Sequence, residues 1–126
     1  MDPFANYFGT GMLEKALDAA TLRQQVISNN IANVNTEGFR PQAVAFEEKL
    51  TELCQQASDD NPDSGGWPSG FQLASLDAEV ETKEGKIDIN REMTNLGKNQ
   101  ILYNALSSKI SGYLGALKYV IDNSGR

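Results

Sequence analysis

The amino-acid sequence predicts a mainly α-helical protein whose long N-terminal and C-terminal helices pair as an antiparallel coiled-coil hairpin. Two observations support this fold class. Apolar residues recur at alternating steps of four and three near both ends of the chain, a repeat of about 3.5 residues. An acidic stretch with Gly and Pro separates the two ends. We also expect a short middle helix, a flexible acidic loop and a small β-hairpin, all in one domain spanning residues 1–126.

Composition and charge exclude several functions. The chain has 126 residues, 40% of them apolar, with no His and one Cys. A His-ligated zinc site, a Cys-based cluster and a Ser-His-Asp triad are therefore impossible, and we expect no metal, no cofactor, no catalytic residues and no small-molecule substrate. No apolar run reaches the roughly 18 residues of a membrane span. The net charge of −6 argues against nucleic acid as a partner.

The charge is unevenly distributed along the chain. Residues 1–40 carry four acids and three bases, residues 41–90 eleven acids and three bases, and residues 91–126 two acids and five bases. The two ends are thus poor in acidic charge, as expected of surfaces that meet other protein. The acidic middle is expected to be solvated.

Residues 1–11 predict a flexible lead-in, because they combine Gly, Pro and scattered aromatics without a sustained period. They lack the basic segment and long apolar core of a Sec-type signal peptide. The first long helix is predicted over residues 12–34. Its seam positions are Leu13, Leu17, Ala20, Gln24, Ile27, Ile31 and Val34. Gln24 is the one polar seam position and can fix the register of the pair. Met12, Ala16, Ala19 and Val26 widen the apolar stripe, which indicates contact with more than one partner.

The helix ends in an Asn-rich run and a turn. Asn amides lie beside the apolar face, which favours packing against protein, although a fraying helix end with an Asn/Gly stop signal explains the pattern equally well. Gly38 is the expected position of positive φ.

This run resembles the N-terminal signature of bacterial flagellar axial proteins, the rod, hook and hook-associated subunits. The sequence Asn-Asn-Ile-Ala-Asn-Val-Asn-Thr-Glu-Gly-Phe-Arg departs from the usual signature at two positions, where Glu37 replaces Pro and Phe39 replaces Tyr. The matching residues are Asn29, Asn30, Ile31, Ala32, Asn33, Asn35, Thr36, Gly38 and Phe39. The segment Val44-Ala45-Phe46-Glu47-Glu48-Lys49-Leu50 that follows is similar to the proximal-rod members of the family.

The middle of the chain is predicted from weaker patterns. Apolar spacing indicates a helix over residues 44–57, and residues 58–70 form a linker rich in Asp, Gly and Pro. Its acids, Asp59, Asp60 and Asp63, could be proposed as paired carboxylates for hydrolysis or as calcium ligands. A flexible loop does not hold carboxylates at a fixed separation, and the EF-hand spacing is absent, so a solvated loop is the favoured interpretation. Trp67 is either a docking residue or simply exposed. A hairpin is predicted around Glu84-Gly85.

The second long helix is predicted over residues 91–121, capped by Asp88 or Asn90, and residues 122–126 are a tail. The apolar positions expected to pack against other subunits are Met93, Leu96, Tyr103, Leu106, Ile110, Leu114, Leu117 and Ile121, together with Leu13, Leu17, Ala20, Ile27, Ile31 and Val34 of the first helix. The segment from Arg91 to Leu106 resembles the C-terminal helix of proximal-rod proteins. A two-helix hairpin would leave Leu22, Leu102, Leu106 and Val120 facing outward, so we expect the free subunit to be partly disordered at its ends or to self-associate.

The resemblance implies a structural subunit of the flagellar proximal rod, with its terminal helices packed into a hollow torque-transmitting shaft. The implied partners are other rod subunits, junction and membrane-ring proteins of the basal body, and the flagellar type III export gate. The resemblance also implies export without a cleaved signal peptide and assembly in the periplasm. Phe4 and Phe8 have the spacing of an export motif, although a disordered tail is the simpler interpretation. The alternative function is a coiled-coil adaptor or export chaperone of a type III secretion system, which leaves the Asn-rich signature unexplained.

Overall fold

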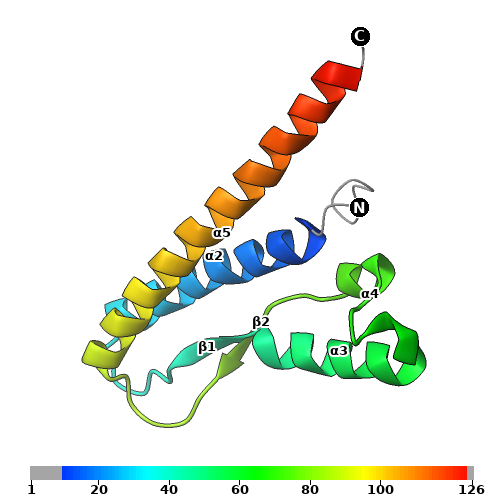
Figure 1. The fold of residues 1–126 in the computed structure, drawn as a ribbon. Coiled ribbons are helices and arrows are strands. Elements are labelled where there is room, and N and C mark those ends of the chain that lie inside the picture. The colour runs from blue at the N-terminus through cyan, green and yellow to red at the C-terminus, as the bar shows by residue number, and fades with distance from the viewer. Residues whose placement is uncertain (1–9, 125–126) are drawn as a thin grey trace.

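The computed structural model describes residues 10–124 and places one long helix in the middle of the molecule. This helix, α2 (Thr10–Ala32), lies between the long C-terminal helix α5 (Ile89–Ser124) and a layer made of β1 (Gln42–Ala45), β2 (Glu79–Thr82), α3 (Glu47–Asp60) and α4 (Gly70–Ala74) (Figure 1). A short 3-10 helix, η1 (Pro62–Ser64), follows α3. The mainly α-helical class and the packing of the two terminal helices are as predicted.

The two long helices are antiparallel. Asn30, near the end of α2, contacts Glu92 at the beginning of α5, and Ala20, further back in α2, contacts Asn99. Because α5 has 36 residues and α2 has 23, the C-terminal part of α5 extends beyond its partner, and Figure 1 shows it diverging from α2. The predicted hairpin is therefore present, but the two helices stay adjacent over only part of α5.

The ends of the helices follow their capping chemistry. Helix α2 ends at Ala32, two residues before the predicted boundary, and a series of turns follows in which Gly38 has φ 78°, in the left-handed region that was predicted. Helix α5 begins at Ile89, where Asp88 Oδ1 accepts the backbone N–H groups of Asn90 (3.1 Å) and Arg91 (3.3 Å). Of the two predicted caps, Asp88 is the one that acts.

The antiparallel strand pair differs from the predicted hairpin in its partner. Strand β2 pairs with β1, which precedes it by more than thirty residues, with Gln42 opposite Thr82 and Ala45 opposite Glu79. The hairpin around Glu84-Gly85 was wrong, because Gly85 (φ 98°) lies in the turn that leads into α5 rather than between two strands. The ladder continues one bond further, from Lys83 N–H to the Pro41 carbonyl (2.7 Å).

The middle segment contains more regular structure than was predicted. Residues 42–45, whose last two were assigned to a helix, form β1, so α3 begins later, at Glu47, and continues to Asp60. The acidic stretch after it was expected to be a loop, but it contains η1 and α4. The Asn61 carboxamide accepts the Asp63 N–H (3.3 Å), and Ser69 caps α4 with Gln72 in a reciprocal capping box.

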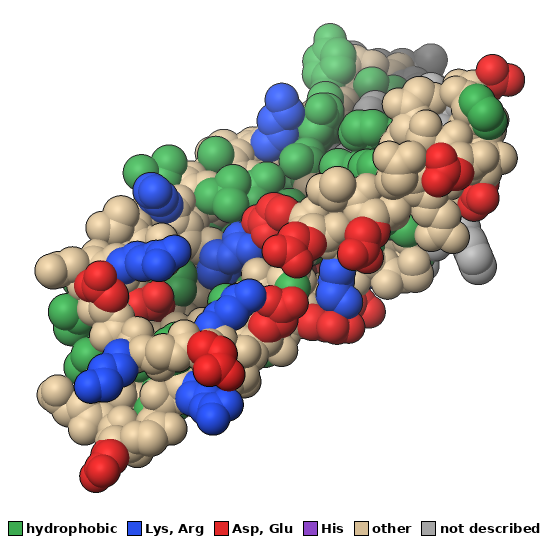
Figure 2. Space-filling model, turned by 90° about the horizontal axis from the view of Figure 1, so that it is seen from below, with side chains coloured by type: hydrophobic (Ala, Val, Ile, Leu, Met, Phe, Trp, Pro, Cys, Tyr) green, Lys and Arg blue, Asp and Glu red, His purple; other side chains and the backbone are tan. Residues whose placement is uncertain are grey.

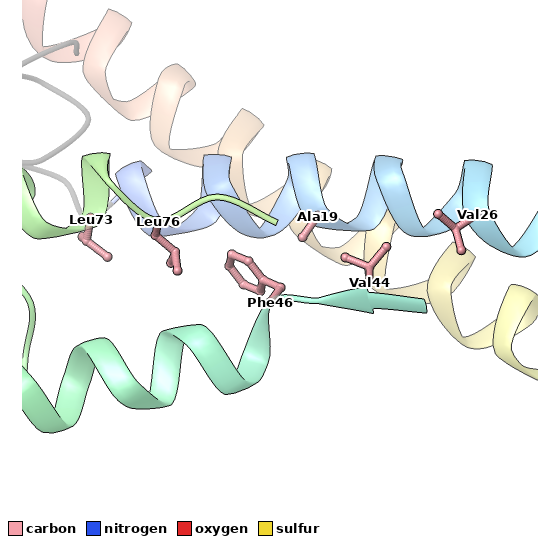
Figure 3. Packing of buried hydrophobic residues seen from close by; sticks show 6 residues of the cluster. All are labelled: Ala19, Val26, Val44, Phe46, Leu73 and Leu76. Atoms are coloured by element: carbon pink, nitrogen blue, oxygen red, sulfur yellow. The ribbon is translucent and has the colours of Figure 1, made fainter. Parts of the chain in front are cut away.

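The hydrophobic core lies between α2 and the strand-and-helix layer (Figure 3). Its buried members come from α2, β1 and α4, from the junction between β1 and α3, and from the segment after α4: Ala19, Val26, Val44, Phe46, Leu73 and Leu76, with Met12, Ala16, Leu22, Leu50, Leu53 and Ala78 packed against them. The residues predicted to widen the apolar stripe of α2 therefore contact the chain's own middle segment. Leu22, expected to face outward, is half-buried against this core.

Candidate assembly surface

The Asn-rich run places one carboxamide inside the subunit. Asn30 is fully buried, with 0% of its surface exposed. Its Nδ2 donates to the Gln42 carbonyl (2.8 Å) and to Glu92 Oε2 (3.1 Å), while the Gln42 N–H donates to its Oδ1 (3.0 Å). A carboxamide carries the same donor and acceptor as a peptide group, so Asn30 pairs with β1 much as a neighbouring strand would. One side chain thus joins α2, β1 and α5.

The other signature residues are exposed or half-buried, and several of them shape the turn after α2. Asn33 Nδ2 donates to the Asn29 carbonyl (2.8 Å) and more weakly to Asn29 Oδ1 (3.3 Å), and Thr36 Oγ1 donates to Asn33 Oδ1 (3.1 Å). The Asn amides were expected to favour packing against other protein, but the amide of Asn30 is used within the chain.

A second buried amide joins the two long helices. Asn99 is 3% exposed, and its Nδ2 donates to the Ala20 carbonyl (2.8 Å) and, at the distance limit, to Gln24 Oε1 (3.5 Å). Asn99 Oδ1 is buried without a hydrogen-bond partner among the described residues. Gln24, predicted as the polar register position of the seam, therefore lies opposite another amide, and the pair of amides fixes how α5 sits on α2.

A groove of about 310 Å³ runs between α2, β1 and α5 beside these amides. It is lined by Arg23, Val26, Ile27, Gln42, Ala43, Val44, Glu92, Asn95, Lys98, Asn99 and Leu102. The wall formed by Arg23 is fixed, because its Nη2 donates to the Val44 carbonyl (3.2 Å) and to Glu47 Oε2 (2.8 Å).

The bond from Arg23 also acts on Glu47. Partial burial would raise the pKa of Glu47, but the hydrogen bond from Arg23, a backbone hydrogen bond and the Arg23 charge together outweigh it and hold that pKa below its ordinary value. The carboxylate is therefore charged at neutral pH and ties the beginning of α3 to α2. Sequence reasoning did not single out Arg23 or Asn99, since each depends on a partner distant in sequence.

Helix α5 is covered far less than α2. In residues 89–123, Asn99 is the only buried residue, whereas α2 buries Ala19, Ala20, Val26, Ile27 and Asn30. The predicted packing positions of α5 form a stripe that we call its seam face. Leu96, Leu106, Ile110 and Leu117 of this face are half-buried, and Met93, Tyr103, Leu114 and Ile121 are exposed, Leu114 to 57%. Of the positions predicted to pack in the first helix, Ala20 and Ile27 are buried and Leu13, Leu17, Ile31 and Val34 are half-buried, with Val34 lying just after the end of α2.

The acidic residues considered for hydrolysis or calcium binding lie at the surface. The described residues contain no group of three or more His, Cys, Asp or Glu side chains that could hold a metal ion, and Asp59, Asp60 and Asp63 are all exposed. No described helix has the length and hydropathy needed to cross a membrane. The export-motif candidates Phe4 and Phe8 lie outside the described residues. The distinctive feature of the site is thus a long, partly uncovered helix held by polar contacts to a well-packed body, which defines a class of subunit suited to assembly.

Comparison with known proteins gives this class a family. Residues 12–40 match the family described as "Flagella basal body rod protein". The chain is 32% identical over 115 residues to the flagellar basal body rod protein FlgB of Bacillus subtilis, covering 86% of this chain and 89% of the relative. It is 30% identical over 125 residues to FlgB of Borrelia hermsii, covering 87% of this chain and 93% of the relative. A flagellar basal-body rod protein FlgG of Buchnera aphidicola is 35% identical over 79 residues, but the match spans 30% of that protein.

The chain belongs to the flagellar basal body rod protein family and is of the FlgB type. It is a structural subunit of the flagellar rod, and other rod components of the basal body are its partners.

Proposed function

We propose that this subunit builds the proximal part of the rod by packing the seam face of α5 against neighbouring rod subunits in a hollow, torque-transmitting shaft. The observation that carries the proposal is the uneven burial of the two long helices. Helix α2 buries four apolar side chains, those of Ala19, Ala20, Val26 and Ile27, whereas residues 89–123 of α5 bury only the amide of Asn99. Fully burying a Leu or Ile side chain contributes about 1.5–3 kcal/mol. Burial of the exposed side chains of the seam face against another subunit would therefore favour association.

The hydrogen bonds of Asn30 favour a rod subunit over the coiled-coil adaptor or export chaperone. An adaptor needs the heptad pattern but not the Asn-rich run, whereas here Asn30 fixes β1 and α5 to α2. The run is thus part of the subunit's architecture, and it lies in the segment that matches the rod family.

Substitution of Leu114 tests the proposal, because this side chain is 57% exposed and its replacement leaves the core intact. Leu114→Asp should keep the circular dichroism spectrum and melting temperature of the wild type. It should lose most capture of purified rod, junction and membrane-ring proteins in pull-down and cross-linking. Ser108→Asp is the matched control, since it places the same charge at an exposed polar position of α5. Equal capture by both variants would refute the seam face as the interface. Ile31→Asp is less informative, because Ile31 is half-buried within the subunit.

The proposal extends to delivery and location. The subunit would pass through the flagellar type III export gate without a cleaved signal peptide and assemble in the periplasm, with Phe4 and Phe8 as the export motif. Phe4→Ala with Phe8→Ala should reduce secretion while leaving the purified protein's binding to rod proteins unchanged. Wild-type secretion of this double variant would remove the export motif from the proposal.

A further inference from the structure

Helix α5 has a second uncovered face that the proposed packing does not use. Arg91, Lys98 and Lys109 are seven and eleven residues apart, so they lie on one side of the helix. Leu102, 41% exposed, lies on the same side. The two acids of α5, Glu92 and Asp122, fall on other sides. We call this the basic face of α5. None of its three cations forms an ion pair within residues 10–124, although Lys109 Nζ lies 6.0 Å from the Tyr113 ring centroid.

Helix α3 carries the opposite pattern. Glu48, Glu52 and Asp59 lie on one side of it, and all three are exposed. Figure 2 shows acidic side chains gathered on the side of the molecule that carries α3. Within the part of the chain that the structure describes, these three carboxylates form no ion pair, and Asp59 accepts one hydrogen bond from Gln55 Nε2 (3.1 Å). We call this the acidic face of α3.

The charges on the two faces have matching separations. Lys98 and Lys109 are eleven residues apart, and so are Glu48 and Asp59. On a straight helix eleven residues span about 16 Å and return to almost the same side. Two helices laid side by side can therefore bring both cations opposite both carboxylates, in either direction.

The two faces do not meet within one subunit. Helix α2 lies between them, with α5 on one side and α3 on the other (Figures 1 and 3). The complementary pair is thus available only to two different molecules.

We propose that the basic face of α5 in one copy docks along the acidic face of α3 in a second copy of this chain. The occupant is a second copy because the chain itself presents the complementary charges at the matching separation. The whole chain carries a net charge of −6, which opposes adsorption to an anionic membrane or nucleic acid. The contact joins two different surfaces, so each copy keeps one free face of each kind and the association is head-to-tail. The inference rests on the proposed role in assembly, but it uses a side of α5 other than the seam face.

Charge reversal on each face provides the test. In Lys98→Glu with Lys109→Glu both faces are acidic, and in Glu48→Lys with Asp59→Lys both faces are basic. Each double variant alone should self-associate at least about tenfold more weakly than wild type, since like charges now oppose each other. An equimolar mixture of the two should associate again, because each basic face then meets an acidic one. Sedimentation equilibrium at about 0.05 M and 0.5 M salt measures this, with association weaker at high salt.

A matched control uses exposed charges outside the two faces, Lys118→Glu and Glu84→Lys, which should self-associate like wild type. The proposal is overturned if the mixture associates no better than its two components. Binding of wild type to vesicles with 30% anionic lipid, lost in Lys98→Glu with Lys109→Glu, would assign the basic face to a membrane and also overturn it. If Leu114→Asp loses capture by rod proteins while the charge variants self-associate like wild type, the proposed function stands and this inference fails.

Discussion

Replacing Asn30 by Ala removes a fully buried carboxamide and breaks its bonds to both backbone groups of Gln42 and to Glu92. Leaving a buried donor or acceptor without a partner costs about 1–3 kcal/mol. Gln42 and Glu92 are half-buried, so water restores part of their hydrogen bonding. The cost of each lost hydrogen bond therefore falls near the low end of this range. We therefore expect Asn30→Ala to lower the free energy of unfolding by about 2–3 kcal/mol, estimated from that range.

Urea unfolding followed by circular dichroism measures this loss, with Asn29→Ala as the neighbouring control. The Asn29 side chain is exposed and accepts one long bond from Asn33 Nδ2 (3.3 Å), so Asn29→Ala should change the free energy of unfolding by less than about 0.5 kcal/mol. Asn30→Asp keeps the side-chain size but removes the donor and places a carboxylate beside Glu92. It should destabilise the fold at least as much as Asn30→Ala. If Asn30→Ala and Asn29→Ala lower the free energy of unfolding equally, the hydrogen bonds of Asn30 to Gln42 and Glu92 do not hold β1 and α5 to α2.

Three further predictions concern the core, a helix cap and pH. Phe46→Ala should cost about 3–5 kcal/mol in urea unfolding, because it empties the centre of the core, whereas Trp67→Ala, at a 60% exposed position, should cost less than about 0.5 kcal/mol. Asp88→Ala should cost about 1 kcal/mol by removing the cap of α5, and Asp88→Asn should recover most of it; no difference between the two would argue against capping. Because Glu47 has a lowered pKa in the folded state, its bond to Arg23 stabilises the fold above the ordinary Glu pKa, and this contribution is lost as the pH falls through the folded value. In Arg23→Met the free energy of unfolding should therefore fall less than in wild type as the pH is lowered. The difference should be less than about 1 kcal/mol, because Glu47 is largely exposed. The same pH dependence in both proteins would contradict this.

The sequence patterns that depend on local chemistry predicted the structure well. The repeat of steps of four and three located both long helices to within three residues, and Gly38 has the positive φ that its position after an Asn-rich helix end required. Asp88 caps α5 as one of two predicted candidates. Each of these features is fixed by residues within a few positions of one another.

The features that the sequence did not predict depend on distant partners. Strand β2 resembles half of a local hairpin, because Gly85 follows it closely, but its partner β1 lies far back in the chain. The Asn-rich run predicted amides that pack against protein. The residues next to Asn30 in the sequence, however, do not indicate that its partners are Gln42 and Glu92. Asn99 was not predicted, because a repeat of apolar residues does not reveal an amide that donates to a backbone carbonyl of another helix.

The burial of Asn99 has a mechanical consequence for the subunit. Among residues 89–123 of α5, Asn99 is the only buried side chain, and the apolar side chains of this stretch are half-buried or exposed. Moving α5 away from α2 would break the hydrogen bonds that Asn99 and Glu92 make with α2, whereas the core around Phe46, which contains no residue of α5, would keep its contacts. The position of α5 in the subunit thus depends on these polar contacts and on half-buried apolar side chains, and not on the core around Phe46.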